Sequence, residues 1–108
     1  MTITQSTEYR KAHIEHTHEL ISQYEKIVQH HTNLTHEEYN QLFRVVHSIK
    51  SNAYAMGLTE VTQYVQSFED QFVASRQSHD LIHNRPLLLQ FIFKTRYLLN
   101  FALMTRAA

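Results

Sequence analysis

The sequence predicts an all-α protein, an up-down four-helix bundle that forms a single domain over residues 1–108. The chain has only one Gly and one Pro, too few for the tight turns of a β-sandwich or a β-barrel. Apolar residues make up 43% of the chain and recur at three- and four-residue spacing in four segments, with no strand-like alternation. The scarcity of glycine also excludes the glycine-rich phosphate loops of nucleotide-binding proteins.

The first two predicted helices are separated by a short polar stretch. The first runs from about Ser6 to His31. Thr35 followed by Glu38 has the pattern of a capping box, so the second helix should begin there, and Gly57 stands where its C-terminal cap belongs. The apolar stripes are Leu20, Ile21, Tyr24, Ile27 and Val28 in the first helix, and Leu42, Val46, Ile49, Ala53 and Met56 in the second.

The third predicted helix follows Gly57 almost at once, and so short a join implies an antiparallel pair. The polar segment Ser75–Arg85 is predicted to be a loop, and Pro86 fits the first position of a fourth helix capped by Asn84 or Arg85. The fourth helix is apolar on most sides, which indicates deep burial or a second packing surface. The stripes are Val61, Val65, Phe68 and Phe72 in the third helix, then Leu88, Phe91, Leu98 and Ala102 in the fourth, with Leu87, Ile92, Phe93, Leu99 and Met104 around it.

Charge and cysteine content exclude several classes of function. Ten Lys and Arg balance ten Asp and Glu, so there is no basic field to hold nucleic acid or anionic lipid. The absence of cysteine excludes disulfide scaffolds, thiolate zinc sites and cysteine catalysis. The start of the chain lacks an apolar signal core, and the most apolar stretch, Leu87–Met104, carries Lys94 and Arg96. We expect a soluble, cytoplasmic protein with no nucleic-acid or membrane partner.

The second predicted helix places one histidine on its exposed side. If the apolar stripe faces the core, His47 points about 140° away from it, at about 100° per residue. Lys50 lies one turn from His47, and the small Ser51 lies beside it. A phosphoryl acceptor needs these features: an accessible nucleophilic nitrogen, a positive charge for the phosphoryl oxygens and room for a partner. On geometry alone, a solvated surface histidine is the more frequent explanation.

The run LFRVVHSIKSNAYAMGL, Leu42–Leu58, resembles the phosphoacceptor helix of histidine phosphotransfer (HPt) domains. It is most similar to the N-terminal HPt domain of chemotaxis-type histidine kinases, whose pattern is F-R-x-x-H-S-I-K-G-x-A-x-x-L/F-G. The Glu of that family on the following helix corresponds to Glu69, and the resemblance covers about Leu42 to Asp70. The matching residues of the run are Phe43, Arg44, His47, Ser48, Ile49, Lys50, Ala53 and Gly57.

The resemblance implies a phosphorelay module, either free-standing or part of a larger kinase. It would carry a phosphoryl group on Nε2 of His47 between a histidine kinase or receiver domain and a response-regulator receiver. Lys50 would contact the phosphoryl oxygens, and Glu69 would accept a hydrogen bond from Nδ1–H and keep Nε2 free. The module would be a carrier and not an enzyme, with no ATP site and no cofactor of its own. Mg²⁺ would belong to the partner receiver or kinase domain.

Two residues near His47 depart from the family pattern. Ser51 replaces the usual Gly after Lys50 and is still small, whereas Tyr54 replaces a second Gly with a bulky ring. Tyr54 either packs against the bundle or takes part in docking. The expected docking surface for a receiver is the exposed stripe Asn40, Arg44, His47, Ser51 and Tyr54.

Two alternatives from other classes stay open. The first is a non-catalytic interaction domain, a degenerate HPt fold that only binds a receiver or dimerises through its apolar fourth helix. For the oligomeric state we expect a monomer, with dimerisation through the fourth helix as the alternative. The second is a metal-binding bundle, since His13/His16 and His79/His83 have spacings that could chelate a metal if helical. A haemerythrin-like diiron bundle needs a Glu four residues after a His, and no histidine here has one; H-E-x-x-H is also absent. We therefore expect no metal.

Overall fold

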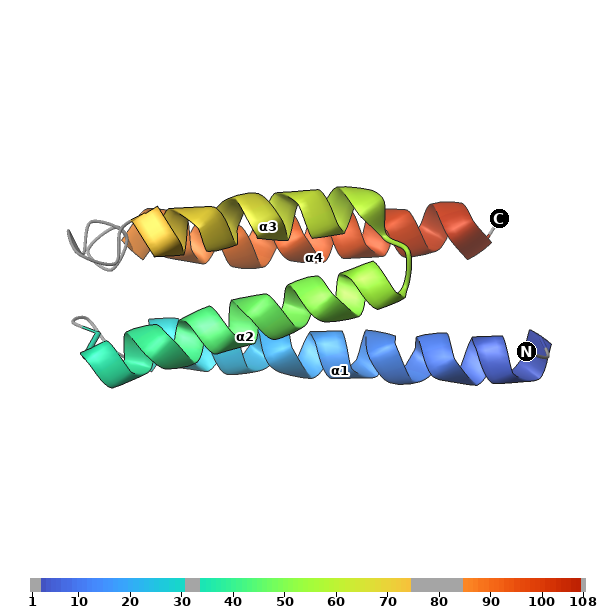
Figure 1. Ribbon diagram of the computed structural model, residues 1–108, viewed down its shortest axis with the longest axis horizontal. Helices are drawn as coiled ribbons and strands as arrows, with labels where there is room; N and C mark the ends of the chain where they lie inside the picture. Colours follow the sequence, from blue (N-terminus) through green and yellow to red (C-terminus); the bar gives the residue numbers. More distant parts are fainter. Residues whose placement is uncertain (1–2, 31–33, 75–84, 108) are drawn as a thin grey trace.

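The computed structural model describes residues 3–30, 34–74 and 85–107, which form four helices in up-down order (Figure 1). They are α1 (Ile3–His30), α2 (His36–Ala55), α3 (Thr59–Ala74) and α4 (Arg85–Ala107). Each helix packs against two neighbours, in the cyclic order α1, α2, α3 and α4, so α2 and α4 occupy opposite corners of the bundle. The predicted all-α, up-down four-helix bundle is confirmed.

The ends of α2 are set by the capping residues that the sequence predicted. The backbone N–H of Glu38 donates to Oγ1 of Thr35 at 3.1 Å, and the backbone N–H of Thr35 donates to Oε1 of Glu38 at 2.9 Å, which completes the capping box. Gly57 has a φ of 70°, a left-handed conformation that glycine adopts without steric cost. The hydrogen bonds Gly57 N–H to Tyr54 O and Leu58 N–H to Ala53 O form a Schellman motif. This motif turns the chain directly from α2 into α3.

The core is built from the apolar stripes of the four helices. Every predicted stripe residue of α2 and α3 is buried, and in α1 only Ile27 is partly exposed. Aromatic rings fill the centre: the Phe68 and Phe91 centroids are 4.3 Å apart, and those of Tyr24 and Phe91 are 5.0 Å apart. Aromatic pairs of this kind contribute about 0.5–1.5 kcal/mol beyond their buried area. This packing fixes α3 against α4 and α1, and so fixes the side of α3 that faces α2.

Two predictions about helix boundaries differ from the structure. Helix α1 begins at Ile3 rather than near Ser6 and ends at His30. Arg85 is the first residue of α4 and not its cap, and a guanidinium N–H of Arg85 donates to the carbonyl oxygen of Gln29 on α1 at 3.2 Å. The predicted cap Asn84, and the rest of the predicted loop, lie outside the described residues.

The buried side of α4 also differs from the prediction. Leu88 and Phe91 face the core as expected, whereas Leu98 and Ala102 are only partly buried. Because α4 is apolar around most of its circumference, the sequence pattern gave little indication of which side would meet α1 and α3. Over residues 85–104, where burial is described, the buried residues of α4 are Leu88, Phe91, Ile92, Thr95 and Leu99.

Over Arg85–Met104, α4 is long and apolar enough to cross a membrane by length and composition alone, with a mean hydropathy of 1.2. However, the core side of α4 is integral to the bundle. The hydroxyl of Tyr24 donates to the carbonyl oxygen of Leu88 at 2.8 Å, and Arg96 forms an ion pair with Glu25 on α1 at 3.3 Å. Transfer of α4 to a bilayer would break these contacts and open the aromatic core. We therefore assign α4 to the bundle.

Candidate functional site

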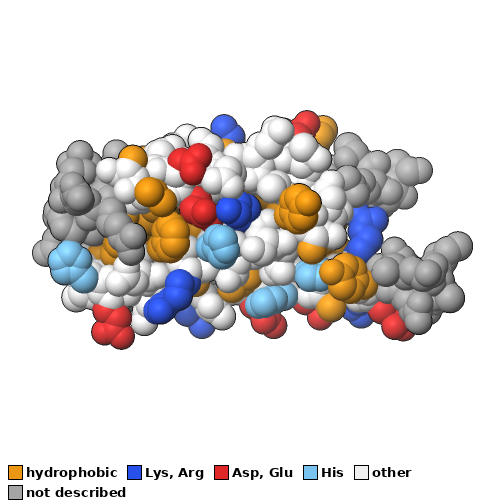
Figure 2. Space-filling model, in the orientation of Figure 1, with side chains coloured by type: hydrophobic (Ala, Val, Ile, Leu, Met, Phe, Trp, Pro, Cys, Tyr) orange, Lys and Arg blue, Asp and Glu red, His pale blue; other side chains and the backbone are white. Residues whose placement is uncertain are grey.

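The outward side of α2 carries the stripe that was predicted to meet a partner. Asn40, Arg44, His47, Ser51 and Tyr54 all lie on exposed positions of the helix. The Tyr54 residue is 77% exposed, so its ring does not pack against the bundle, which removes one of the two alternatives left open for it. Figure 2 views this side of the molecule: a histidine lies beside acidic and basic side chains near the centre, with hydrophobic side chains to either side.

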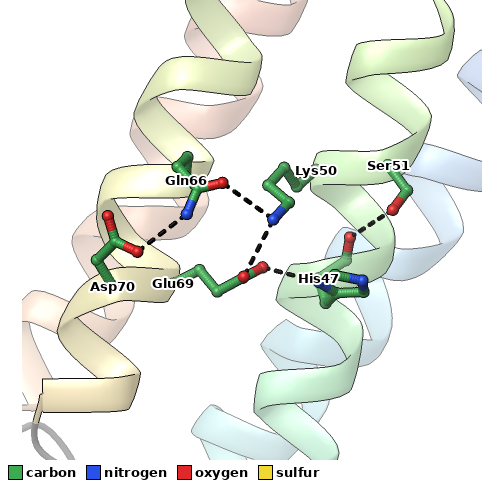
Figure 3. Close-up of polar contacts among 6 residues, drawn as sticks. All are labelled: His47, Lys50, Ser51, Gln66, Glu69 and Asp70. Atoms are coloured by element: carbon green, nitrogen blue, oxygen red, sulfur yellow. Dashed lines mark hydrogen bonds and ion pairs between the residues drawn. The ribbon is translucent and has the colours of Figure 1, made fainter.

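The imidazole of His47 lies between this exposed stripe and α3. Its Nδ1 is 3.0 Å from Oε2 of Glu69 (Figure 3). An ionised carboxylate can only accept a hydrogen bond, so this contact requires the imidazole to carry a proton on Nδ1. In the neutral ring the lone pair is then on Nε2, on the side of the ring away from Glu69. The side chain is 56% exposed, so Nε2 is an accessible nucleophilic nitrogen.

Glu69 is a buried carboxylate at the α2–α3 contact. The residue is 8% exposed, and both of its oxygens are occupied: Oε2 by His47, and Oε1 by Nζ of Lys50 at 3.0 Å. Burial of a charge is costly unless it is paired and hydrogen-bonded, and Glu69 meets both conditions. Because Phe68 and Phe72 anchor the adjoining side of α3 in the core, the carboxylate is held at a fixed place beside α2.

The ammonium of Lys50 lies one helical turn after His47 and is held by α3. Besides Glu69, Nζ donates to Oε1 of Gln66 at 3.0 Å, and Nε2 of Gln66 in turn donates to Oδ1 of Asp70 at 2.9 Å (Figure 3). An ammonium has three N–H donors, and these contacts use two of them. These two contacts leave one N–H of the ammonium without a partner on α3. Because two contacts to α3 hold it, the Lys50 side chain has already lost most of its conformational freedom.

The chain matches the family model of the Hpt domain over residues 8–98. It belongs to the HPt domain family. The match includes most of α1 and of α4, so it extends the resemblance from the α2–α3 segment to the whole bundle. Searches of curated proteins and of solved structures gave no significant match. The closer similarity to chemotaxis-type HPt domains stays a prediction.

HPt domains are phosphocarriers and not catalysts. They exchange phosphoryl groups with kinases and with response-regulator receivers in phosphorelays, and this assigns the chain a histidine phosphotransfer role. The structure brings together the three residues to which the resemblance gave a chemical role, His47, Lys50 and Glu69. These three residues form one continuous network across the α2–α3 contact of the HPt bundle.

Sequence reasoning missed Gln66 as part of this HPt network. Gln66 lies three residues before Glu69, so both side chains project from the same side of α3. That spacing could have indicated Gln66 once Glu69 was singled out. Its amide bridges Lys50 to Asp70 and so orients the cation from the side opposite to His47.

The hydroxyl of Ser51, where most HPt domains have Gly, donates to the backbone carbonyl of His47 at 3.1 Å. A serine in a helix commonly satisfies its hydroxyl in this way, on the carbonyl one turn earlier. The side chain therefore stays close to the helix and leaves the approach to His47 open.

A second polar cluster joins α1 to α2 on the other side of the site. Asn52 is 9% exposed; its Oδ1 lies 3.1 Å from Nδ1 of His13, and its Nδ2 lies 3.3 Å from Nδ1 of His16. His13 is partly buried because α1 packs on α2 here. Within the described residues, no three His, Cys, Asp or Glu side chains gather as metal ligands, and His79 and His83 lie outside them.

Proposed function

We propose that this HPt domain accepts a phosphoryl group on Nε2 of His47 and passes it to the aspartate of a receiver domain. The observation that carries the proposal is the hydrogen bond from Nδ1 of His47 to Glu69. It occupies one ring nitrogen and leaves the lone pair on the exposed one. During acceptance, an N–P bond forms at Nε2 as the bond from phosphorus to the donor oxygen breaks, and that oxygen stays with the donor. Transfer to a receiver aspartate breaks the N–P bond as a new O–P bond forms.

Lys50 and Glu69 are proposed to assist this exchange without taking part in the bond changes. Phosphoryl transfer depends mainly on positioning and on neutralising the charge of the three equatorial oxygens. The remaining donor of Lys50 would bind one of these oxygens, while Glu69 keeps the imidazole oriented. We expect the chain itself to hold no cofactor. Mg²⁺, bound in the acidic pocket of the receiver or kinase domain, would supply the remaining positive charge.

The receiver is proposed to dock on the stripe Asn40, Arg44, Ser51 and Tyr54 around His47. A groove of about 500 Å³ between α1 and α2 adjoins this stripe. Arg44 and Lys26 provide the cations of the groove, beside the apolar side chains of Leu20, Ile27 and Val45. A partner whose contact surface combines carboxylates with an apolar side chain would complement such a groove. We place this exchange in the cytoplasm.

The experiment is a transfer assay with the intact chain and a panel of donors. Each receiver is phosphorylated with labelled phosphate, freed of the small-molecule donor and mixed with the HPt domain and Mg²⁺. We expect at least one receiver to lose label to the chain within seconds to minutes, and the labelled chain to return it to an unlabelled receiver. A kinase domain with labelled ATP tests the opposite direction. Receivers that bind tightly but transfer no label would contradict the proposal and indicate a binding-only HPt fold.

A further inference from the structure

Helix α4 exposes a long apolar stripe on the side opposite to its buried residues. Phe93 and Met104 are each 72% exposed, Tyr97 is 67% exposed, and Phe101 is 49% exposed. These positions repeat at three- and four-residue spacing, so their side chains line one side of the helix. The rings of Tyr97 and Phe101 stack with centroids 6.3 Å apart and an interplanar angle of 16°. The stripe is therefore an apolar surface with stacked aromatic rings near its centre.

The cations that border this stripe are engaged by the bundle on either side of it. Arg96 pairs with Glu25 of α1, and Nζ of Lys94 lies 5.0 Å from the ring centroid of Tyr64 on α3. The centre of the stripe thus carries no charge, and its polar members are the amides Gln90 and Asn100. Protein interfaces are enriched in Tyr, Phe and Met at the centre and depleted in charge there, and this stripe has the same composition. A surface that binds anionic lipid or nucleic acid would instead need cations that are not already held by the bundle.

The area of the stripe is large enough for a stable protein contact. The four large side chains together expose on the order of 500 Å², given about 150–250 Å² for an aromatic side chain. With Pro86, Leu89, Gln90 and Asn100 at the flanks, one copy offers on the order of 700 Å², above the ~300–600 Å² of the largest apolar patch on a typical monomer. Two such surfaces would bury on the order of 1,400 Å², within the ~1,200–2,000 Å² of stable interfaces.

We propose that a second copy of this chain covers the stripe, with the two α4 helices antiparallel and related by a two-fold axis at Tyr97. A two-fold contact uses the same surface on both copies, so the stripe must complement itself when reversed. Phe93 and Phe101 lie four residues to either side of Tyr97, so each would face the other residue in the second copy. Met104 would likewise face Gln90, above a hollow of about 570 Å³ lined by Leu89, Gln90, Phe93 and Tyr97 among others.

This pairing leaves the phosphotransfer site open. His47 lies on α2, which contacts α1 and α3 and occupies the corner opposite to α4. The two histidines of the dimer would therefore both face outward. Dimerisation through α4 does not depend on the chemistry of His47, and phosphoryl acceptance is expected to be equal in the monomer and the dimer.

The first test measures the mass of the intact chain by sedimentation and light scattering over about 1 μM to 1 mM. Interfaces of this area have dissociation constants from about micromolar to picomolar. With increasing concentration, the mass should therefore approach twice the 12.8 kDa of one chain and should not increase further. Tyr97→Glu should remain monomeric at every concentration, because it places two carboxylates against each other at the two-fold axis. The matched control is Val73→Glu, at an exposed apolar residue of α3 away from the stripe, which should dimerise as the parent does.

A second test holds even if Tyr97→Glu fails to fold. The chain contains no cysteine, so Tyr97→Cys introduces a single thiol that should face its own copy at the axis. We expect mild oxidation to give a disulfide-linked dimer, at least tenfold faster than for Val73→Cys at the same concentration. A parental mass of 12.8 kDa throughout would overturn the proposal, as would equal cross-linking of the two variants or growth beyond two copies. Flotation of a monomeric chain with anionic lipid vesicles would overturn it in favour of a membrane surface.

Discussion

The carboxylate of Glu69 on α3 lies 3.0 Å from Nδ1 of His47 through one oxygen and 3.0 Å from Nζ of Lys50 through the other. One buried acid therefore holds both the proposed nucleophile and the proposed phosphoryl-binding cation. Because the two contacts use different atoms, their contributions to transfer can be separated by substitution at either end.

Glu69→Gln should slow phosphoryl acceptance by His47 at least about tenfold, because hydrogen bonds to charged groups contribute about 1.5–3 kcal/mol. The amide is neutral and cannot hold the imidazole and the ammonium as the carboxylate does. The ¹⁵N shifts of the His47 ring should also move from the Nδ1–H tautomer toward a mixture. Glu60→Gln makes the same chemical change at an exposed position of α3 and should alter neither quantity. An unchanged tautomer and rate in Glu69→Gln would show that Glu69 does not orient the imidazole of His47.

Lys50→Ala should slow transfer by a similar factor through loss of the cation while the nucleophile remains. It also leaves the buried Glu69 with one partner fewer, so the free energy of unfolding should fall by about 1–3 kcal/mol. Rates are therefore compared at a temperature at which both proteins are fully folded by circular dichroism. Lys11→Ala, at an exposed position of α1, is the control and should match the parent. A parental transfer rate in Lys50→Ala would show that Lys50 is structural only.

Tyr54→Ala should weaken receiver binding by about 1 kcal/mol or more, since an exposed aromatic near the centre of a small interface often dominates its affinity. Its thermal stability should stay within about 0.5 kcal/mol of the parent, because the ring makes no core contact. Ser51→Leu should block docking sterically in the same titration. Tyr97→Ala removes a ring of similar exposure from α4, 67% against 77% for Tyr54, and should bind the receiver with parental affinity per chain. Normal affinity in Tyr54→Ala and Ser51→Leu would place the docking surface elsewhere.

Tyr24, one of the buried tyrosines of the core, should make the bundle sensitive to alkali. Burial, and then the nearby Tyr64, raise the pKa of Tyr24 well above its ordinary value. In the folded protein the Tyr24 hydroxyl is neutral. Its contribution to the free energy of unfolding is therefore fully present below the ordinary tyrosine pKa of about 10, and it is lost as the pH rises through the higher pKa of the folded state. Burial also raises the pKa of Tyr64, which adds to the same trend.

Tyr24→Phe should therefore reduce the fall in melting temperature between pH 9 and pH 11. At neutral pH, loss of the hydrogen bond to the Leu88 carbonyl should cost about 1 kcal/mol. Melting curves of both proteins across this range test the point. Identical slopes above pH 10 would show that ionisation of Tyr24 does not control alkaline unfolding.

Much of the fold could be predicted from local sequence patterns. Local interactions, between residues a few positions apart, determine the capping box at Thr35, the left-handed Gly57 and the buried stripes of α2 and α3. Such interactions can be recognised from the spacing of residues along one helix. The exposed position of His47 followed from the same periodicity. The Glu69 partnership was expected from the family resemblance, because contacts between helices are not encoded in spacing along one helix.

The parts that could not be predicted depend on how the helices meet. Because α4 is apolar on most sides, its sequence does not distinguish the buried side from the exposed one. Leu99 rather than Leu98 faces the core. Gln66 and the Asn52–His13 contact join residues from different helices, and their roles depend on side-chain geometry at those contacts. Polar residues of this kind carry no period in the sequence that distinguishes them from solvent-exposed positions.

The most direct test of the central claim is to locate the phosphoryl group after transfer from a receiver. We expect one phosphoryl group per chain on Nε2 of His47, stable in alkali and lost in acid. It is identified by ³¹P–¹H NMR and by mass spectrometry of peptides kept at alkaline pH. His47→Gln should take up no label while its folding free energy stays within about 0.5 kcal/mol of the parent. His18→Gln, at an exposed histidine of α1, should label fully. Undiminished labelling of His47→Gln, or a phosphoryl group found on another residue, would contradict the account.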